Sequence, residues 1–371
     1  MQGYYLYCYS DLSDPRNAST GVDKKILSQI EVLNNNDCNC EFVYCQAPQT
    51  FFKKSLSCVP WLSDGIAWPR VEDLRSADYL YIRRPAIVGR ELLSFLSAFK
   101  QSNPSSLVLY EIPTYPYDKE MTGLLSFALY KDRLYRNQLK KYVDYIVDLS
   151  KTPCIFGIPT IQMFNGVVLN NYRIKNEVSN LESVNIIAVA FFEKWHGIDR
   201  LLKGMKSYYD SGQTREVRLH LVGGGTALDG LKKMASDFDL TDKVIFHGVL
   251  KGTELDSVYD QCTLGIECLG IHRKDSVQVS SSLKSREYLA KGIPFVGSSK
   301  IDVFCEHPAD FFHMVPADES PIDIVDLLNF HDAIYKNYGQ TNLIKAIRRY
   351  AENFVSMDSA MSHVIDAIRS I

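Results

Sequence analysis

The sequence predicts an α/β protein of two domains, each built on a parallel β-sheet with helices on both faces. Short apolar runs alternate with helix-like stretches along both halves of the chain, as they do where parallel strands are joined by crossover helices. A chain of 371 residues is long for one hydrophobic core but suits two domains. The polar residues 170–183 interrupt the strand pattern and mark the expected boundary.

The composition is that of an ordinary globular protein, with 46% hydrophobic and 23% charged residues. A net charge of −3 argues against general nucleic-acid binding. No apolar run has the length of a membrane span and the N-terminus lacks a signal pattern, so we expect a cytoplasmic protein. The nine cysteines are scattered, and no histidine precedes His196, which favours reduced thiols over a zinc site.

Apolar runs predict the strands of the first half at residues 3–9, 40–45, 78–82, 107–112 and 145–149. The helix after the first strand is expected at residues 22–33. Gly21, in the loop before it, lets the backbone approach a ligand at the carboxyl edge of the sheet. One glycine in such a loop is weak evidence by itself.

Residues 127–142 form a basic amphipathic segment, with five positive charges against one negative. A solvated helix that covers the sheet is the favoured interpretation. Docking on a membrane surface is the alternative.

In the second half, apolar runs predict strands at residues 184–190, 217–222, 244–250, 264–268 and 293–296. Three glycines, residues 223–225, follow the second of these strands and bring backbone close to a ligand or a neighbouring element. The chain should end in two helices, residues 343–354 and 357–371. The last helix has an apolar stripe at Met361, Val364, Ile365 and Ile368.

The most informative stretch is the predicted helix at residues 283–291, which opens with Ser281 or Ser282 as its N-cap. Free amides, hydroxyls and the positive end of the helix dipole make such a start an anion site, and Lys284 adds a full charge. Glu287 lies roughly 7 Å further along the axis. A nucleoside diphosphate fits this arrangement, with its phosphates on the amides and its ribose on the carboxylate.

Residues 281–294, Ser-x-Leu-Lys-x-Arg-Glu-Tyr-Leu-Ala-x-Gly-Ile-Pro, resemble the donor-site signature of GT-B glycosyltransferases in the retaining family 4. Taken without its neighbours, the motif could also be an ordinary amphipathic helix and strand of any doubly wound α/β protein. The resemblance covers nearly the whole chain in order and is specific over residues 184–297. It implies two Rossmann-like domains, residues 1–170 and 180–350, that face each other across a cleft. A C-terminal helix, residues 356–371, would cross back to the first domain.

The resemblance places the nucleotide-sugar donor on the second domain. A basic pair in the first βα turn of the family holds the donor diphosphate, and Lys194 and His196 are the candidates for that role here. Other implied donor-binding positions are Gly21, Gly223, Gly224, His247, Gly248, Leu250, Ser281, Ser282, Lys284 and Glu287.

The family's usual pair of glutamates, eight residues apart, is incomplete. Glu287 matches the second glutamate, but the first position holds Val279. Glu267 or His272 is therefore expected to orient the sugar, and His272 or Arg273 to add positive charge at the diphosphate. A helix N-terminus with a lysine can replace the charge of a metal ion, so neither a metal nor another cofactor is expected.

Arg83, Glu111 and Tyr115 lie near the carboxyl ends of two predicted strands in the first half. By resemblance to polysaccharide-assembly transferases, that edge faces the cleft and these residues contact the acceptor. Tyrosines and paired charges suit a sugar. A structural ion pair between Glu111 and Arg83 or its neighbour explains the same residues equally well.

The resemblance implies transfer of a sugar, with retention, from a UDP-sugar or, less favoured, a GDP-sugar. The implied acceptor is a hydroxyl of a glycan or a lipid-linked glycan in surface-polysaccharide synthesis. Because the first glutamate is missing, an inactive GT-B subunit that binds nucleotide or another transferase is the alternative. Residues 127–142 would provide any peripheral contact with the inner face of a membrane.

Overall fold

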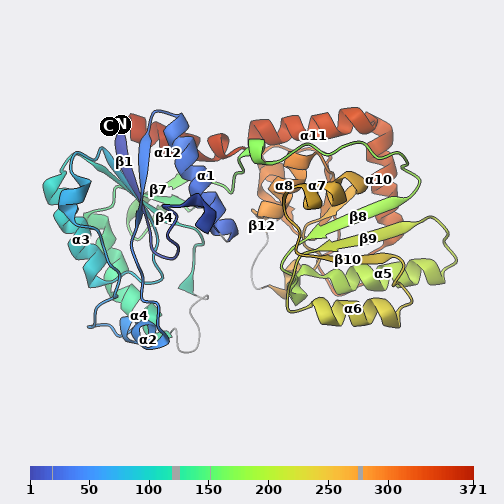
Figure 1. The fold of residues 1–371 in the computed structure, drawn as a ribbon, viewed down its shortest axis with the longest axis horizontal. Helices are drawn as coiled ribbons and strands as arrows, with labels where there is room; N and C mark the ends of the chain where they lie inside the picture. Colours follow the sequence, from blue (N-terminus) through green and yellow to red (C-terminus); the bar gives the residue numbers. More distant parts are fainter. Residues whose placement is uncertain (19, 119–125, 151, 275–278) are drawn as a thin grey trace. The chain divides into compact units, whose positions relative to one another are not determined.

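The computed structural model describes residues 1–18, 20–118, 126–150, 152–274 and 279–371 (Figure 1). The chain forms two compact units. The first contains residues 1–166 and 357–371, and the second contains residues 167–356. No helix in the described ranges combines the length and apolar character that a membrane span requires.

Unit 1 folds around a sheet whose described strands have the order β2-β1-β3-β4-β5-β7-β6. All neighbours are parallel except β6 and β7, which form a short antiparallel hairpin. The bounds are β1 Gln2–Tyr7, β2 Asn39–Tyr44, β3 Tyr79–Arg83, β4 Leu107–Ile112, β5 Tyr145–Asp148, β6 Cys154–Ile155 and β7 Ile158–Gln162.

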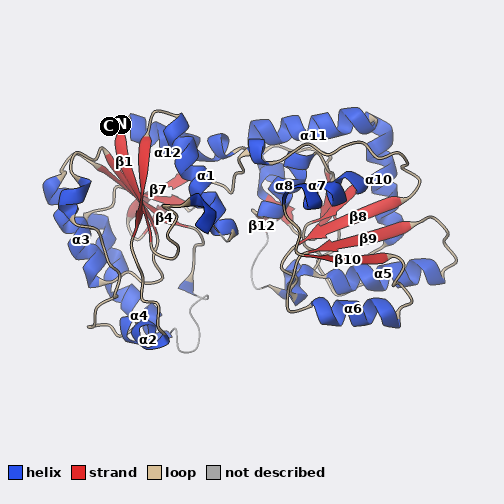
Figure 2. Cartoon of the chain, in the orientation of Figure 1, coloured by secondary structure: helices blue, strands red, loops and turns tan. Residues whose placement is uncertain are grey.

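The helices of unit 1 are α1 Gly21–Asn35, α2 Phe51–Ser57, α3 Arg90–Ser102, α4 Ser126–Tyr135 and α12 Met357–Arg369, with a 3-10 helix over Arg136–Lys141. Thr20 and Asp23 cap α1 reciprocally, since each side chain accepts the other residue's amide hydrogen. Helix α12 is last in the sequence but packs on α1 and β7 (Figure 2). Its predicted apolar stripe, Met361 to Ile368, is buried there.

Unit 2 has a six-stranded parallel sheet in its described part, in the order β10-β9-β8-β11-β13-β15. Its strands are β8 Val184–Val189, β9 Val217–Val222, β10 Val244–Gly248, β11 Leu264–Ile266, β13 Phe295–Gly297 and β15 Phe312–Met314, and a separate short ladder pairs β12 Val279–Ser280 with β14 Lys300–Ile301. Its helices are α5 Ile198–Asp210, α6 Leu228–Asp237, α7 Gly252–Gln261, α8 Leu283–Lys291, α9 Asp302–Glu306, α10 Ile324–Tyr338 and α11 Gln340–Phe354.

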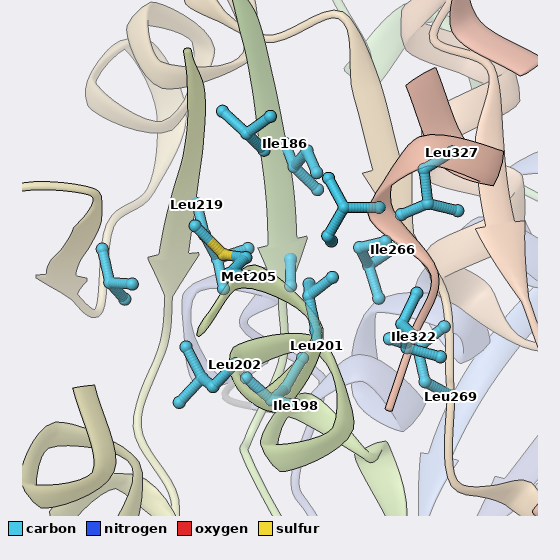
Figure 3. Close-up of a cluster of buried hydrophobic side chains, with 14 of the residues drawn as sticks. Ile186, Ile198, Leu201, Leu202, Met205, Leu219, Ile266, Leu269, Ile322 and Leu327 are labelled. Carbon is cyan, nitrogen blue, oxygen red and sulfur yellow. The ribbon is translucent and has the colours of Figure 1, made fainter. Parts of the chain in front are cut away.

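Two apolar layers cover the faces of this sheet. On one face, α5 packs Leu201 and Met205 against Ile186 and Leu219 of the central strands (Figure 3). Helices α7, α8 and α11 cover the opposite face, and α10 contributes to both layers. The predicted α/β class with parallel sheets is therefore confirmed. Sequence patterns missed β6, β7, β12, β14 and β15. All of these except β7 have only two or three residues, which carry little readable alternation.

A buried charge network holds β3 and β4 of unit 1 to α1. Glu111 is fully buried and pairs with Arg83 at 2.5 Å and Lys25 at 3.4 Å. It also accepts hydrogen bonds from the Tyr81 hydroxyl at 2.8 Å and the Gln29 amide at 3.1 Å. Burial alone would raise the pKa of Glu111, but Arg83 and Lys25 outweigh it and lower the pKa to about 2. Arg83 and Glu111 are thus engaged inside unit 1, as the ion-pair interpretation predicts.

Replacement of the carboxylate should destabilise unit 1. Glu111→Gln leaves Arg83 and Lys25 buried without a counterion, so we expect the free energy of unfolding to fall by about 3–5 kcal/mol in urea titrations at neutral pH. Glu31→Gln, on the exposed side of α1, is the matched control and should change it by less than about 0.5 kcal/mol.

The interaction of Glu111 with Arg83 and Lys25 also makes the stability of unit 1 depend on pH. Folding lowers the pKa of Glu111 from 4.5 to about 2, so the unfolded chain binds the proton first. The wild-type contribution is complete above about pH 5 and is lost as the pH falls toward 2. Glu111→Gln should lack this part of the acid dependence, and an unchanged acid profile would contradict the assignment.

Candidate functional site

The loops after β8 and β9 meet through glycines that leave no room for side chains. Gly223 has a φ of +134°, and a Cβ built on it would lie 1.9 Å from the carbonyl oxygen of Ala190. A Cβ on Gly225 would lie 2.2 Å from the Phe192 nitrogen. The Phe192 amide donates to the Gly224 carbonyl at 2.7 Å. The predicted glycine segment is therefore a close backbone contact at the carboxyl edge of the sheet.

The turn after β8 also packs on the loop after β11. Gly197 has a φ of +71°, and a Cβ there would lie 2.5 Å from the Gly270 nitrogen. The Leu269 amide donates to the His196 carbonyl at 2.9 Å. This contact fixes the position of the Trp195–His196 pair, whose rings stack with centroids 3.8 Å apart.

His196 is a neutral hydrogen-bonding group in this setting. Burial, followed by the charges of Lys284 and Lys274, lowers its pKa to about 3. Its Nδ1 accepts the amide hydrogen of Glu193 at 3.0 Å, so a neutral ring carries its proton on Nε2. His196 can donate to an anion but does not add a positive charge, whereas Lys194 in the same turn is an exposed cation.

Helix α8 brings Lys284 to this turn. Ser282 is its N-cap, and the Ser282 hydroxyl accepts the Ser285 amide hydrogen at 3.1 Å. The Lys284 ammonium donates to the backbone carbonyl of Glu267 and lies 5.8 Å from the ring centroid of Trp195. Burial lowers the pKa of Lys284, and the Glu267 carboxylate opposes that shift. The contact joins the start of α8 to the end of β11.

Glu267 follows β11 and is only 3% exposed. Its Oε1 accepts from the Ser280 hydroxyl at 3.4 Å, but Oε2 has no hydrogen-bond partner among the described residues. A Cβ on Gly297 would lie 3.3 Å from Oε2, so this glycine lets the backbone after β11 and β13 pass close to the enclosed carboxylate. Because a buried carboxylate oxygen without a partner costs stability, we expect a ligand hydroxyl or water to satisfy it.

Comparison with known proteins identifies the architecture that carries this site. Residues 173–272 match the family model "Glycosyl transferases group 1". No curated protein matches the sequence. Solved structures match along the whole chain, however. The sucrose-phosphate synthase of Thermosynechococcus elongatus is 14% identical with a TM-score of 0.61, over 100% of this chain and 99% of that chain.

Two further structures show the same arrangement. Anabaena HepE in complex with UDP is 12% identical with a TM-score of 0.61, over 100% of both chains. The apo lipopolysaccharide outer core galactosyltransferase WaaB is 14% identical with a TM-score of 0.58, over 100% of this chain and 99% of that chain. The protein has the GT-B fold. Lys284, His196 and Glu267 lie in the unit of this GT-B chain that contains the group 1 match.

Glu287 lies one turn beyond Lys284 on α8, beside two tyrosines. Burial, and then the Glu287 charge, raise the pKa of both Tyr259 and Tyr172. Two cations near Glu287 in the sequence have aspartate partners. Arg286 is fully buried and binds both oxygens of Asp302 at 2.6 and 2.7 Å, and Lys291 pairs with Asp256. Ser281 also contacts Arg286, at 3.3 Å.

Three of the implied donor-binding positions, His247, Gly248 and Leu250, lie at the end of β10 or just after it. His247 Nε2 is 3.0 Å from Nδ1 of His220, and burial lowers the pKa of both rings. Gly248 has a φ of +69°, and its carbonyl accepts the Gly223 amide hydrogen at 2.7 Å. Leu250 packs on the α8 face of the sheet. The backbone of this segment is therefore tied to the loop after β9.

Arg273 and His272 have carboxylate partners in the structure. Arg273 pairs with Asp199 of α5 at 2.6 Å and with Glu319, while His272 contacts Glu319 at 2.7 Å. The Arg273 contacts hold the loop after β11 against α5. The predicted roles of both residues at the sugar and the diphosphate stay predictions.

Besides Arg83 and Glu111, two predicted positions belong to unit 1. Gly21 is the first residue of α1, directly after the Thr20 cap. Tyr115 is half-buried and packs edge-on against Tyr117 and Phe156, with centroids 6.4 and 5.9 Å apart. In unit 2, the sequence analysis did not single out Trp195. Its position directly before His196 was the one sequence feature that could have pointed to it.

The ionisation of His196 can be followed by NMR. We expect its imidazole shifts to stay those of a neutral ring from pH 8 down to about 4, because burial and Lys284 lower its pKa to about 3. A histidine in a model peptide titrates near pH 6.5. Lys284→Met should raise the pKa of His196 only in part, since burial is the larger cause. Protonation near pH 6.5 would show that the ring is solvated.

Proposed function

We propose that the protein is a glycosyltransferase that moves a sugar, with retention, from a nucleotide-diphosphate sugar to an acceptor hydroxyl. The observation that carries this proposal is the meeting of Lys284, neutral His196 and the half-satisfied Glu267 at the start of α8. The group 1 match over residues 173–272 supports the same reaction. Structures of HepE contain UDP or UDP-glucose, which favours UDP over GDP.

The diphosphate would bind at the N-terminus of α8. First-turn amides and the helix dipole favour an anion, and Lys284 supplies a positive charge close to them. His196 Nε2 would donate a hydrogen bond, and exposed Lys194 would add a second cation. In the transfer, the bond between the anomeric carbon and the phosphate oxygen breaks, and its electron pair stays on the diphosphate. These groups stabilise that developing charge without a metal ion.

Glu267 would orient the sugar in place of the missing first glutamate. Its carboxylate contacts Ser280, the residue after Val279, so it lies next to the position where the family has that glutamate. Oε2 can accept a hydrogen bond from a sugar hydroxyl. The acceptor oxygen then forms its bond to the anomeric carbon, and its proton passes to the oxygen of the leaving diphosphate. Orientation of both reactants is the main protein contribution to such a step.

The acceptor and location are part of the same proposal. A glycan or lipid-linked glycan of surface-polysaccharide synthesis is the acceptor class that the resemblance implies. The reaction would take place in the cytoplasm, with residues 127–142 in contact with the inner face of the membrane.

An inactive GT-B subunit remains the second candidate because Val279 replaces the first glutamate. Slow hydrolysis of a UDP-sugar without acceptor separates the two. The proposed enzyme releases UDP, whereas an inactive subunit binds the nucleotide and releases none.

Glu287 is expected to bind the ribose hydroxyls. Glu287→Gln should weaken UDP binding by about 1.5–3 kcal/mol, the range for a hydrogen bond to a charged group. It should weaken 2′-deoxy-UDP less, because that ligand already lacks one of the hydroxyls. Calorimetry of both proteins with both ligands completes this thermodynamic cycle. Glu254→Gln, at an exposed position of α7, is the control. Equal losses for the two ligands would remove Glu287 from the ribose site.

Glu267 can be tested by separating sugar orientation from nucleotide binding. Glu267→Gln keeps the side-chain shape, so it should lower kcat with UDP-glucose by about tenfold or more and leave the Kd for UDP unchanged, because UDP carries no sugar. Thermal unfolding of the variant serves as the folding control. Parallel losses in UDP affinity and turnover would assign Glu267 a structural role.

A further inference from the structure

Helix α2 is the least buried helix of unit 1. None of its seven residues is buried, and Phe51 and Phe52 are 79% and 71% exposed. Isolated helices of this length are marginal in water and normally depend on packing of an apolar face. A short helix that presents two phenylalanines to solvent therefore suggests an apolar partner outside the chain.

Helix α4, which lies beside α2, also carries exposed apolar side chains. Phe127, Tyr130 and Leu134 are 64%, 57% and 46% exposed on it. Its Lys131 is buried and donates to the carbonyl oxygens of Ser57 and Leu62, each at 2.8 Å. Those bonds hold α4 beside α2 and the segment after it, as the ribbon also shows (Figure 1). We call Phe51, Phe52, Trp61, Phe127, Tyr130 and Leu134 the α2–α4 face.

The exposed charges on these elements have one sign. Lys53 and Lys54 of α2, and Lys140 and Lys141 after α4, are exposed. The acidic residue of α4, Asp132, is fully buried and accepts from the Val88 amide and the Tyr117 hydroxyl, at 2.8 and 2.7 Å. Exposed aromatic side chains on a helix that also carries exposed lysines match the interface of an anionic lipid bilayer.

A cavity lies behind α2. It has a volume of about 350 Å³ and is lined mainly by carbon, from residues that include Cys8, Pro48, Ile87 and Ala128, with Cys58 after α2. Helix α2 thus covers an incompletely filled space.

We propose that the α2–α4 face docks unit 1 on a bilayer that contains anionic lipids. The face extends the membrane contact suggested for residues 127–142, because Phe51, Phe52 and Trp61 come from the connection between β2 and β3. Like charges around aromatic side chains favour lipid headgroups over a second copy of the face, which would bring the lysines together. The inference adds to the proposed function, since it would bring the enzyme to a lipid-linked acceptor, but docking itself needs no transferase activity.

The test is co-sedimentation of the full chain with vesicles of phosphatidylcholine alone, or mixed equally with phosphatidylglycerol. Wild type should bind the mixed vesicles, less so at high salt. The triple variant Phe51→Ser/Phe52→Ser/Trp61→Ser should lose about tenfold or more in binding. Met314→Ser/Val325→Ser, which changes two exposed apolar residues of unit 2, should bind like wild type. Lys53→Gln/Lys140→Gln/Lys141→Gln should lower binding to the mixed vesicles alone.

A second measurement covers the case in which the triple variant fails to fold. With brominated lipids in the vesicles, wild-type tryptophan fluorescence should be quenched, and Trp61→Phe should abolish that quenching. The proposal is rejected if wild type binds neither vesicle, if quenching persists in Trp61→Phe, or if the triple variant folds and binds normally. Wild-type dimers that the triple variant converts to monomers would instead assign the face to a second copy. UDP release from UDP-glucose without vesicles tests the transferase proposal separately.

Discussion

Close backbone contact between loops at the carboxyl edge of the unit 2 sheet is the constraint on which the candidate site depends. Gly197 against Gly270, and Gly223 against Ala190, leave no space for side chains. The loops after β8, β9 and β11 therefore lie together. Their backbone contacts fix the positions of His196 and Glu267, which belong to the first and the last of these loops. Lys284 lies beside these loops because its ammonium donates a hydrogen bond to the Glu267 carbonyl. A site held in this way needs little reorganisation when a ligand binds.

Buried arginines stabilise the loops around this site. Arg200 is fully buried and donates to the carbonyl oxygens of Leu269, Pro316 and Ser320, which lie on two separate loops. Arg286 instead donates to both carboxylate oxygens of Asp302, the first residue of α9. A planar guanidinium with five donors can satisfy several backbone carbonyls at once, which a lysine cannot. Positive charge in this unit therefore serves the scaffold as well as the site.

Glu111 and Glu267, both deeply buried, differ in what satisfies their oxygens. Glu111 has Arg83, Lys25, Tyr81 and Gln29 around it, and its low pKa reflects a complete set of partners. Glu267 is almost as buried, but one of its oxygens has no partner within the described part of the chain. The first arrangement rigidifies the fold. The second leaves a hydrogen-bond acceptor for a ligand.

Local sequence signals determined the fold class, the longer strands and the N-cap and end of α8, because hydrophobic alternation, a serine cap and a glycine stop act through near neighbours. The predicted start of α8 also marked Lys284 as a candidate, whereas His196 and Glu267 were candidates only through the resemblance. Only the tertiary structure decided their states. Burial made His196 neutral, Asp199 and Glu319 neutralised Arg273, and Arg83 with Lys25 enclosed Glu111. Those outcomes depend on burial and on charged partners from residues far apart in the chain, which no local pattern encodes.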